Sequence, residues 1–271
     1  LYQTIAAHPE IKLAYVTGRS LEAVLPLLAD PTLPQPDYII ADVGASLVHG
    51  DTLQPIQPLQ SAVDALWPGE SQVASAIEGF DLERQDVPQA RRCSYFCTPE
   101  EAANPALLDA ARALGCDLLY SAERYLDFLP QGVNKGSSLK ALADWLELDA
   151  DQVLAAGDTL NDLSMLSGPF KGVCVGQSET GLLEATAQHS RTLHAKRPGC
   201  GGILEAFAHF GFLGEHGIAA ERRQAAQPGK AELVMVYHRL PYDLHRLVLK
   251  RVPAYELLAC QHNCASTMLS M

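Results

Sequence analysis

Three short polar segments of this chain have the residue types and the settings that phosphate or metal chemistry needs. The hexapeptide GDTLND at 157–162 ends an apolar run, 153–156. In α/β proteins ligands bind at the carboxyl end of such a strand. The oxygens of Asp158, Asn161 and Asp162 suit Mg²⁺, a hard cation that takes oxygen ligands and keeps several waters. The alternative is a turn rich in Asp and Asn that only caps the following helix.

The other two segments could contact a phosphate group. The segment VTGRS at 16–20 ends the apolar run 11–16, and the Thr17 hydroxyl with the Gly18 N–H could hold phosphate oxygens as an anion-binding nest does. An ordinary strand-to-helix turn is the alternative. Lys135, in GVNKGSS at 132–138, begins a helical pattern, where the helix dipole disfavours a cation. We expect it to have an anionic partner, with a solvated surface lysine as the alternative.

The elements that position these segments follow a β–α–β order. Apolar strands are predicted at 11–16 and 36–42, with a helix between them whose apolar residues recur at helical spacing. This order predicts a parallel sheet. Prolines punctuate 54–130, where strands at 92–97 and 125–129 and a helix at 104–114 indicate a small inserted α/β module. The parallel pattern then resumes, with helices near 139–146, 161–166 and 202–210 and strands at 153–157 and 172–175.

In this order, the three segments resemble the haloacid dehalogenase superfamily, specifically the type IIB sugar-phosphate phosphatases that include sucrose-phosphate phosphatase. The resemblance covers roughly residues 1–213 and includes NKGSSLK at 134–140 and GGILE at 201–205. It implies a Rossmann-like, parallel-sheet hydrolase core with an inserted α/β cap, acting on a glycosyl phosphate with Mg²⁺. The implied roles are phosphate binding by Thr17, Gly18 and Lys135, metal binding by Asp158, and support from Asn161 and Asp162.

One part of the family pattern is missing from this chain. The family's nucleophile and general acid/base are the two aspartates of an Asp-x-Asp-Gly-Thr strand ahead of the Thr-Gly pair. Sixteen residues precede Thr17, and none of them is aspartate. We therefore expect an N-terminally shortened fragment that lacks the first core strand and is inactive as a phosphatase by itself.

The C-terminal side carries a second resemblance. The segment AELVMVYHRLPYD at 231–243 resembles the opening of the glucosylglycerol-phosphate synthase group of retaining glycosyltransferases. Together the two resemblances imply a bifunctional osmolyte enzyme, a fused glycosyltransferase as partner, and glucosylglycerol 3-phosphate as substrate. The alternatives are a phosphatase for sucrose phosphate or another sugar phosphate, and a non-catalytic module that regulates an attached glycosyltransferase. The expected domains are a core at 1–54 and 130–214, a cap at 55–129, a linker at 215–230, the glycosyltransferase start at 231–243 and an unassigned tail at 244–271.

The amino-acid composition argues against some classes of binding partner and indicates a cellular compartment. The formal net charge of −12 argues against non-specific binding to nucleic acid or to an anionic membrane. No apolar run approaches the roughly 18 to 20 residues that span a bilayer. Seven scattered cysteines indicate a reducing cytoplasm rather than a disulfide framework. Cys260, His262 and Cys264 lack a second ligand pair, so an incidental cluster is favoured over a zinc site.

Overall fold

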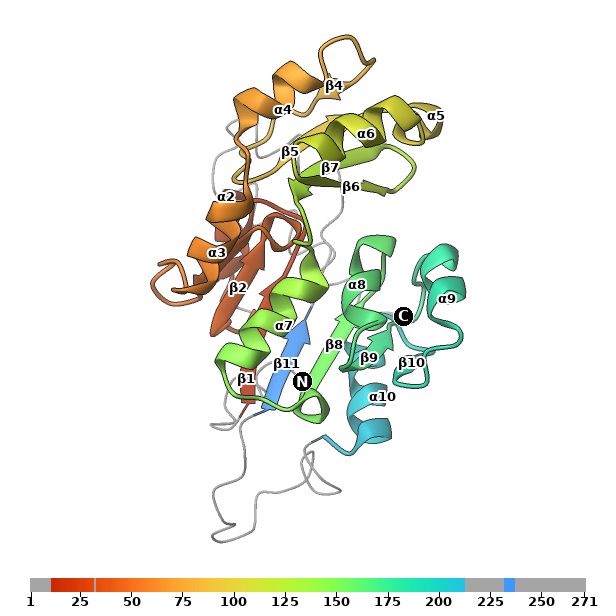
Figure 1. The fold of residues 1–271 in the computed structure, drawn as a ribbon. Coiled ribbons are helices and arrows are strands. Elements are labelled where there is room, and N and C mark those ends of the chain that lie inside the picture. Colours follow the sequence, from red (N-terminus) through yellow and green to blue (C-terminus); the bar gives the residue numbers. More distant parts are fainter. Residues whose placement is uncertain (1–10, 32, 213–231, 237–271) are drawn as a thin grey trace, which may run out of the picture. The chain divides into compact units, whose positions relative to one another are not determined.

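The computed structural model describes residues 11–31, 33–212 and 232–236, the last of these by their backbone alone. A large sheet has the strand order β10-β9-β8-β11-β1-β2-β3 (Figure 1). All its pairs are parallel except β2 with β3. Its strands are β1 (Ile11–Val16), β2 (Tyr38–Ala41), β3 (Ser46–His49), β8 (Val153–Gly157), β9 (Lys171–Cys174), β10 (Thr192–His194) and β11 (Glu232–Val236).

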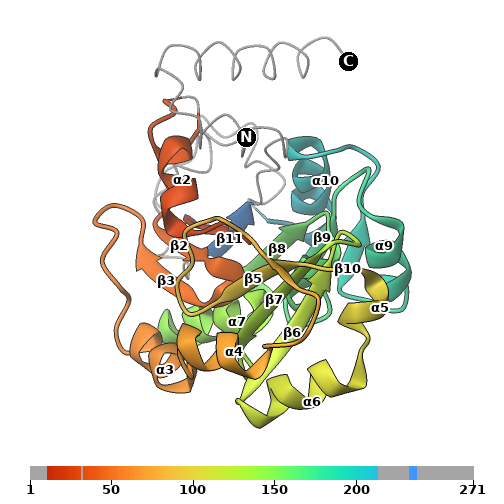
Figure 2. The ribbon, with the colours of Figure 1, turned by 90° about the horizontal axis from the view of Figure 1, so that it is seen from above.

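Helices cover both faces of this sheet, as a parallel sheet requires. They are α2 (Leu21–Leu28), α3 (Leu59–Leu66), α7 (Lys135–Trp145), α8 (Leu163–Leu166), α9 (Thr180–Thr186) and α10 (Cys200–Phe210). Successive residues of β1 and β8 point to opposite faces. Val16 and Ala155 therefore pack in one cluster with Leu139 of α7, and Leu154 in another with Phe207 of α10. Figure 2 shows α7 and α10 on opposite sides of the strands.

The expected inserted module is a four-stranded antiparallel sheet in the order β4-β5-β7-β6. Its strands are β4 (Glu83–Arg84), β5 (Cys93–Phe96), β6 (Cys116–Ser121) and β7 (Tyr125–Pro130), and its helices are α4 (Glu70–Ala76), α5 (Pro99–Ala102) and α6 (Pro105–Ala113). On one face, Tyr95 and Phe128 pack with Leu107 of α6. On the other face, Ser94 lies opposite Asp127, and the neighbouring Leu129 belongs to a cluster of the large sheet. We call this module the cap. The helix α3, which the sequence analysis placed in the cap segment, packs against the large sheet through Val63.

β11 lies between β1 and β8 in the large sheet, although it comes from the segment 231–243 that was expected to open another domain. That domain boundary and the missing first core strand stay predictions, because residues 237–243 lie outside the described residues. Residues 232–236 pair in parallel with β1 on one side and with β8 on the other. β1 and β8 lie two strand spacings apart, and the backbone N–H and C=O groups along their facing edges need partners. A short apolar strand of suitable direction supplies them. The linker 215–230 and the tail 244–271 lie outside the described residues.

No helix in the described ranges is long and apolar enough to cross a membrane.

Candidate active site at the carboxyl edge of the large sheet

The turn that follows β1 is fixed by the turn that follows β2, because neighbouring parallel strands end at the same edge of the sheet. Thr17 N donates to Ile40 O at 2.8 Å, and Val43 N donates to Thr17 O at 3.1 Å. The Thr17 hydroxyl oxygen accepts a hydrogen bond from Arg19 N at 3.1 Å. A hydroxyl that accepts from the backbone keeps its own proton for donation, so Thr17 can serve as a donor to an anion.

Lys135 is the first residue of α7, and its side chain is completely buried. Asn134 and Ser137 form a capping box that sets where the helix begins. The helix start lies directly against Gly44, where a Cβ atom would come within 2.5 Å of the Asn134 carbonyl. Ser138 Oγ also donates to Gly44 O at 2.7 Å. These contacts hold Lys135 beside the turn that follows β2.

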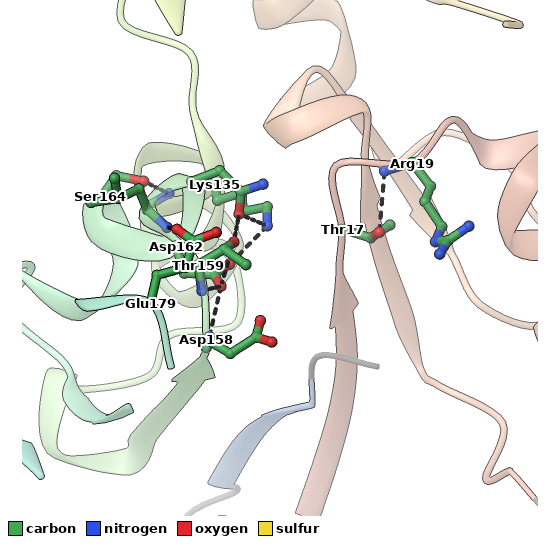
Figure 3. Close-up of polar contacts among 12 residues, drawn as sticks. Thr17, Arg19, Lys135, Asp158, Thr159, Asp162, Ser164 and Glu179 are labelled. Atoms are coloured by element: carbon green, nitrogen blue, oxygen red, sulfur yellow. Dashed lines mark hydrogen bonds and ion pairs between the residues drawn. The ribbon is translucent and has the colours of Figure 1, made fainter. Parts of the chain in front are cut away.

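The ammonium group of Lys135 meets the turn that follows β8. Its Nζ donates to Asp162 Oδ1 at 2.7 Å and to Asn161 Oδ1 at 2.7 Å. The second oxygen of Asp162 accepts from the backbone N–H groups of Asp158, at 3.0 Å, and Thr159, at 3.1 Å. Asp162 is as buried as Lys135. This arrangement, drawn in Figure 3, confirms that Lys135 has an anionic partner and shows that it is Asp162.

Two glycines allow the side chains to come this close. At Gly157 a Cβ atom would lie 2.5 Å from Asp162 Cβ, so only glycine lets Asp162 fold back over the end of β8. At Gly18 a Cβ atom would lie 3.6 Å from Asn161 Nδ2. The amide of Asn161 therefore faces the turn after β1 while its oxygen faces Lys135. Asn161 therefore lies between Lys135 and the turn after β1.

Asp158 directly follows β8 and is 6% exposed. Its carboxylate points away from the Lys135–Asp162 pair, toward the side where Thr17 lies (Figure 3). β1 and β8 flank β11 in the sheet, so the two turns are two strand spacings apart, roughly 10 Å. The hydrogen bonds found for Thr17 join it to the turns at 19 and 40–43. The structure thus brings Lys135, Asn161 and Asp162 into contact, puts Gly18 beside Asn161, and leaves Thr17 and Asp158 on the two sides of β11.

The donor set around Asp158 fits a partial Mg²⁺ site. The described residues contain no group of three or more His, Cys, Asp and Glu that could enclose a metal. Asp162 and Asn161 accept hydrogen bonds from Lys135, and the Asp158 carboxylate points away from that pair. Mg²⁺ commonly uses one or two carboxylates and keeps water or substrate oxygens for its other positions. The single buried carboxylate of Asp158 at this edge is compatible with that coordination.

The sequence analysis missed three residues near the site. Glu179 holds the 158–160 turn: its carboxylate accepts from Leu160 N at 2.7 Å, and its N–H donates to Asp158 O at 2.9 Å. Arg92, from the cap, donates to Gly18 O at 2.7 Å and is 7% exposed. Asp42 is buried beside Arg92; burial outweighs the Arg92 charge and the Ser46 hydrogen bond and raises its pKa to about 6. No local spacing marks any of the three.

A thiol and an arginine elsewhere in the chain have ordinary surroundings, and the Cys/His cluster noted in the sequence lies beyond the described residues. Cys93 is buried in the cap, and desolvation raises the pKa of its thiol to about 11, as expected for a packing residue. Arg197 forms an exposed ion pair with Glu205 at 2.9 Å. The cluster at 260–264 falls outside the described residues.

Comparison with known proteins agrees with this architecture. A family model described as sucrose-6F-phosphate phosphohydrolase matches residues 1–211. A protein of Pseudomonas anguilliseptica named glucosylglycerol-phosphate synthase is 82% identical over 246 residues, which are 91% of this chain and 33% of that protein. This chain thus spans about a third of that relative's length. A mannosylfructose-phosphate phosphatase of Agrobacterium fabrum is 30% identical over 73% of this chain and 83% of its own length.

A solved structure leads to the same family. The sucrose-phosphatase of Synechocystis sp. PCC6803, determined in complex with sucrose and phosphate, superposes with a TM-score of 0.63 at 30% identity, covering 73% of this chain and 84% of that one. The expected parallel α/β core with its inserted cap is confirmed. The chain belongs to the sucrose-6F-phosphate phosphohydrolase family, phosphoric monoester hydrolases with the haloacid dehalogenase fold.

Proposed function

We propose that this domain hydrolyses the phosphate ester of a glycosyl compound, with glucosylglycerol 3-phosphate as the favoured substrate and Mg²⁺ as the cofactor. The observation that carries the proposal is the buried Lys135 ammonium, which is joined to Asn161 and Asp162, with Asn161 in turn next to Gly18. A fully buried ammonium at a ligand-binding sheet edge is suited to neutralising the charge of an anion bound there. The relative named glucosylglycerol-phosphate synthase, aligned over 91% of this chain, supports the choice of substrate.

The proposed division of labour follows from the contacts. The Thr17 hydroxyl, oriented by Arg19 N, donates to a phosphate oxygen together with the Gly18 N–H. Lys135 neutralises charge on the transferring group, and Asp162 keeps the ammonium in place. Fixed donors and charges of this kind supply most of the catalysis in phosphoryl transfer. Asp158 would hold Mg²⁺, with Asn161 and Asp162 in support, and the cation would offset the charge of the phosphate.

The phosphoryl acceptor in this proposal is an aspartate that the chain does not contain. The resemblance assigns it to an Asp-x-Asp-Gly-Thr strand, and that motif is absent from the 271 residues. We therefore infer that this chain binds phosphate but does not turn over substrate alone. We also infer that a glycosyltransferase is fused to the domain, since the chain matches only a third of its 82% identical relative.

A second candidate substrate is sucrose 6-phosphate or a similar disaccharide phosphate. The matching family model and the sucrose-phosphatase structure, both named for that chemistry, favour it. The cap sequence between the two core segments must decide between these sugars, because the phosphate-binding groups are common to both.

The test compares the 271-residue chain with a version extended at its N-terminus by an Asp-x-Asp-Gly-Thr strand. Phosphate release is measured with glucosylglycerol 3-phosphate, sucrose 6-phosphate and mannosylfructose phosphate, with Mg²⁺ or with EDTA. The proposal expects release by the extended chain only, the highest kcat/KM with the first substrate, and loss of release in EDTA. A preference for sucrose 6-phosphate would favour the second candidate. Failure on every substrate would favour the non-catalytic module.

A matched pair of lysines on α7 serves as the control for the site. Lys135→Met removes the buried ammonium and should lower kcat/KM of the extended chain by at least about 100-fold. Lys140→Met removes an exposed ammonium five residues further along the same helix, where Lys140 pairs with Asp144 at 2.6 Å. That variant should stay within about two-fold of the parent. Equal losses in both variants would contradict the proposed role of Lys135.

A further inference from the structure

A buried side chain of the cap, Arg92, contacts the turn after β1. This residue directly precedes β5 and is 7% exposed. Its Nη1 donates to Gly18 O at 2.7 Å across 74 residues of sequence. The guanidinium also lies 3.4 Å from Asp42 Oδ1, in the core, and 3.6 Å from Asp127 Oδ1, in the cap. The carboxylates are both further away than the carbonyl, so charge pairing alone does not explain where the guanidinium points.

The three carbonyl groups of this turn are each held from outside it. Thr17 O accepts from Val43 N at 3.1 Å, and Arg19 O accepts from Asp42 N at 2.7 Å. The core backbone thus holds the first and the third, while the cap holds the middle one, Gly18 O. Arg92 therefore supplies a restraint on the turn that comes from another module of the chain.

Holding the Gly18 carbonyl also fixes the neighbouring N–H. In a planar trans peptide the C=O and the N–H point in opposite directions, so the Gly18 carbonyl aimed at Arg92 directs Arg19 N the other way. Arg19 N donates to Thr17 Oγ1 at 3.1 Å. One rigid peptide plane therefore connects the Arg92 guanidinium to the Thr17 hydroxyl.

We propose that Arg92 is a positioning residue: from the cap, it orients the Gly18–Arg19 peptide and thereby aims the Thr17 hydroxyl at the phosphate group of the substrate. The proposal rests on the proposed function, because it assumes that this turn receives phosphate. It makes phosphate affinity depend on the cap being seated on the core. Asp42 and Asp127 have the further task of neutralising the guanidinium, one from each side of the contact.

The experiment uses the 271-residue chain and inorganic phosphate with Mg²⁺. Affinity is measured by titration calorimetry, and the backbone amide of Arg19 is followed by ¹⁵N–¹H NMR. Arg92→Met should weaken phosphate binding by at least about ten-fold, the effect of losing one hydrogen bond to a charged group. It should also shift the Arg19 amide resonance and reduce its protection from exchange. Arg91→Met is the matched control, since Arg91 pairs with Asp64 at the surface, and it should change neither readout.

Arg92→Lys separates positioning from charge and preserves the fold if the Met variant does not. Lysine keeps a positive charge between Asp42 and Asp127 but lacks the planar fork that reaches the carbonyl and both carboxylates. Weakened phosphate binding in this variant supports positioning, while wild-type affinity would show that Arg92 is only a counter-ion. Affinity in Arg92→Met equal to that in Arg91→Met would also overturn the inference. Absence of phosphate binding by the unmodified chain would instead overturn the proposed function, and this inference with it.

Discussion

Replacing Asp162 by Asn tests how strongly the folded chain depends on its buried ion pair. Asp162 Oδ2 accepts from two backbone N–H groups, and Oδ1 accepts from Lys135 Nζ at 2.7 Å. An asparagine must keep its oxygen toward the two N–H groups, which turns its NH₂ group toward the ammonium. Both side chains are 0% exposed, so water cannot relieve this contact. Breaking a buried pair in this way costs about 3–5 kcal/mol.

The helix that Lys135 begins, α7, also carries an exposed Lys–Asp pair that serves as the control. Lys140 Nζ lies 2.6 Å from Asp144 Oδ2, with side chains 56% and 61% exposed. An exposed pair four residues apart on a helix contributes about 0.3–0.5 kcal/mol. Asp144→Asn should therefore lower the free energy of unfolding by no more than that, although its Lys–Asp distance is equally short.

Urea denaturation followed by circular dichroism, under identical conditions, gives the free energies of unfolding of the parent and both variants. The expected result is a loss several times larger for Asp162→Asn than for Asp144→Asn, with unchanged dependence on urea concentration. A loss below about 1 kcal/mol for Asp162→Asn would refute the argument, because it would mean that the ammonium finds an equally good environment without the carboxylate.

Two further predictions concern groups beside the site. Burial raises the pKa of Asp42 from 3.8 to about 6, so the folded chain binds the proton of this carboxyl group more tightly than the unfolded chain does. As the pH rises from about 4 to about 6, the free energy of unfolding of the parent should therefore fall by about 3 kcal/mol relative to that of Asp42→Asn. Denaturant titrations across that pH range measure the two free energies of unfolding. The prediction would be contradicted if both fell in parallel with pH. Gly157→Ala puts a Cβ atom 2.5 Å from Asp162 Cβ and should cost about 1–3 kcal/mol and weaken phosphate binding. At Gly168 an added Cβ atom would lie 3.4 Å from its nearest neighbour. Gly168→Ala should therefore leave both the free energy of unfolding, from denaturant titration, and phosphate binding unchanged.

The parts of the fold that could be predicted are those whose signal is local. The run at 153–157 is apolar at every position because β8 is buried on both faces. Leu139 and Leu142 repeat at helical spacing and are both fully buried in α7. An anionic partner for Lys135 could also be predicted, since a lysine that begins a helix lies at the positive end of the helix dipole. Which carboxylate it meets could not be predicted from this signal.

Strand order and contacts between modules could not be predicted, because they depend on the three-dimensional arrangement. A five-residue apolar strand such as β11 is compatible with any position in a parallel sheet. Its position is known only from its pairing with β1 and β8. Arg92 is one of two adjacent arginines, and nothing local distinguishes it from Arg91. Its importance comes from Gly18, 74 positions earlier. Glu179 matters in the same way, through the turn it holds after β8.

The balance of charge at the end of β8 bears on the proposed need for a cation. Asp158 and Asp162 bring two carboxylates to an edge where Lys135 brings one ammonium, and all three are at most 6% exposed. Phosphate carries further negative charge, and repulsion between like charges is strong where water is excluded. Bound phosphate would add negative charge to an edge that already holds these two carboxylates. A divalent cation on Asp158 would lower the repulsion between that carboxylate and the phosphate, so we expect phosphate binding and Mg²⁺ binding to strengthen each other.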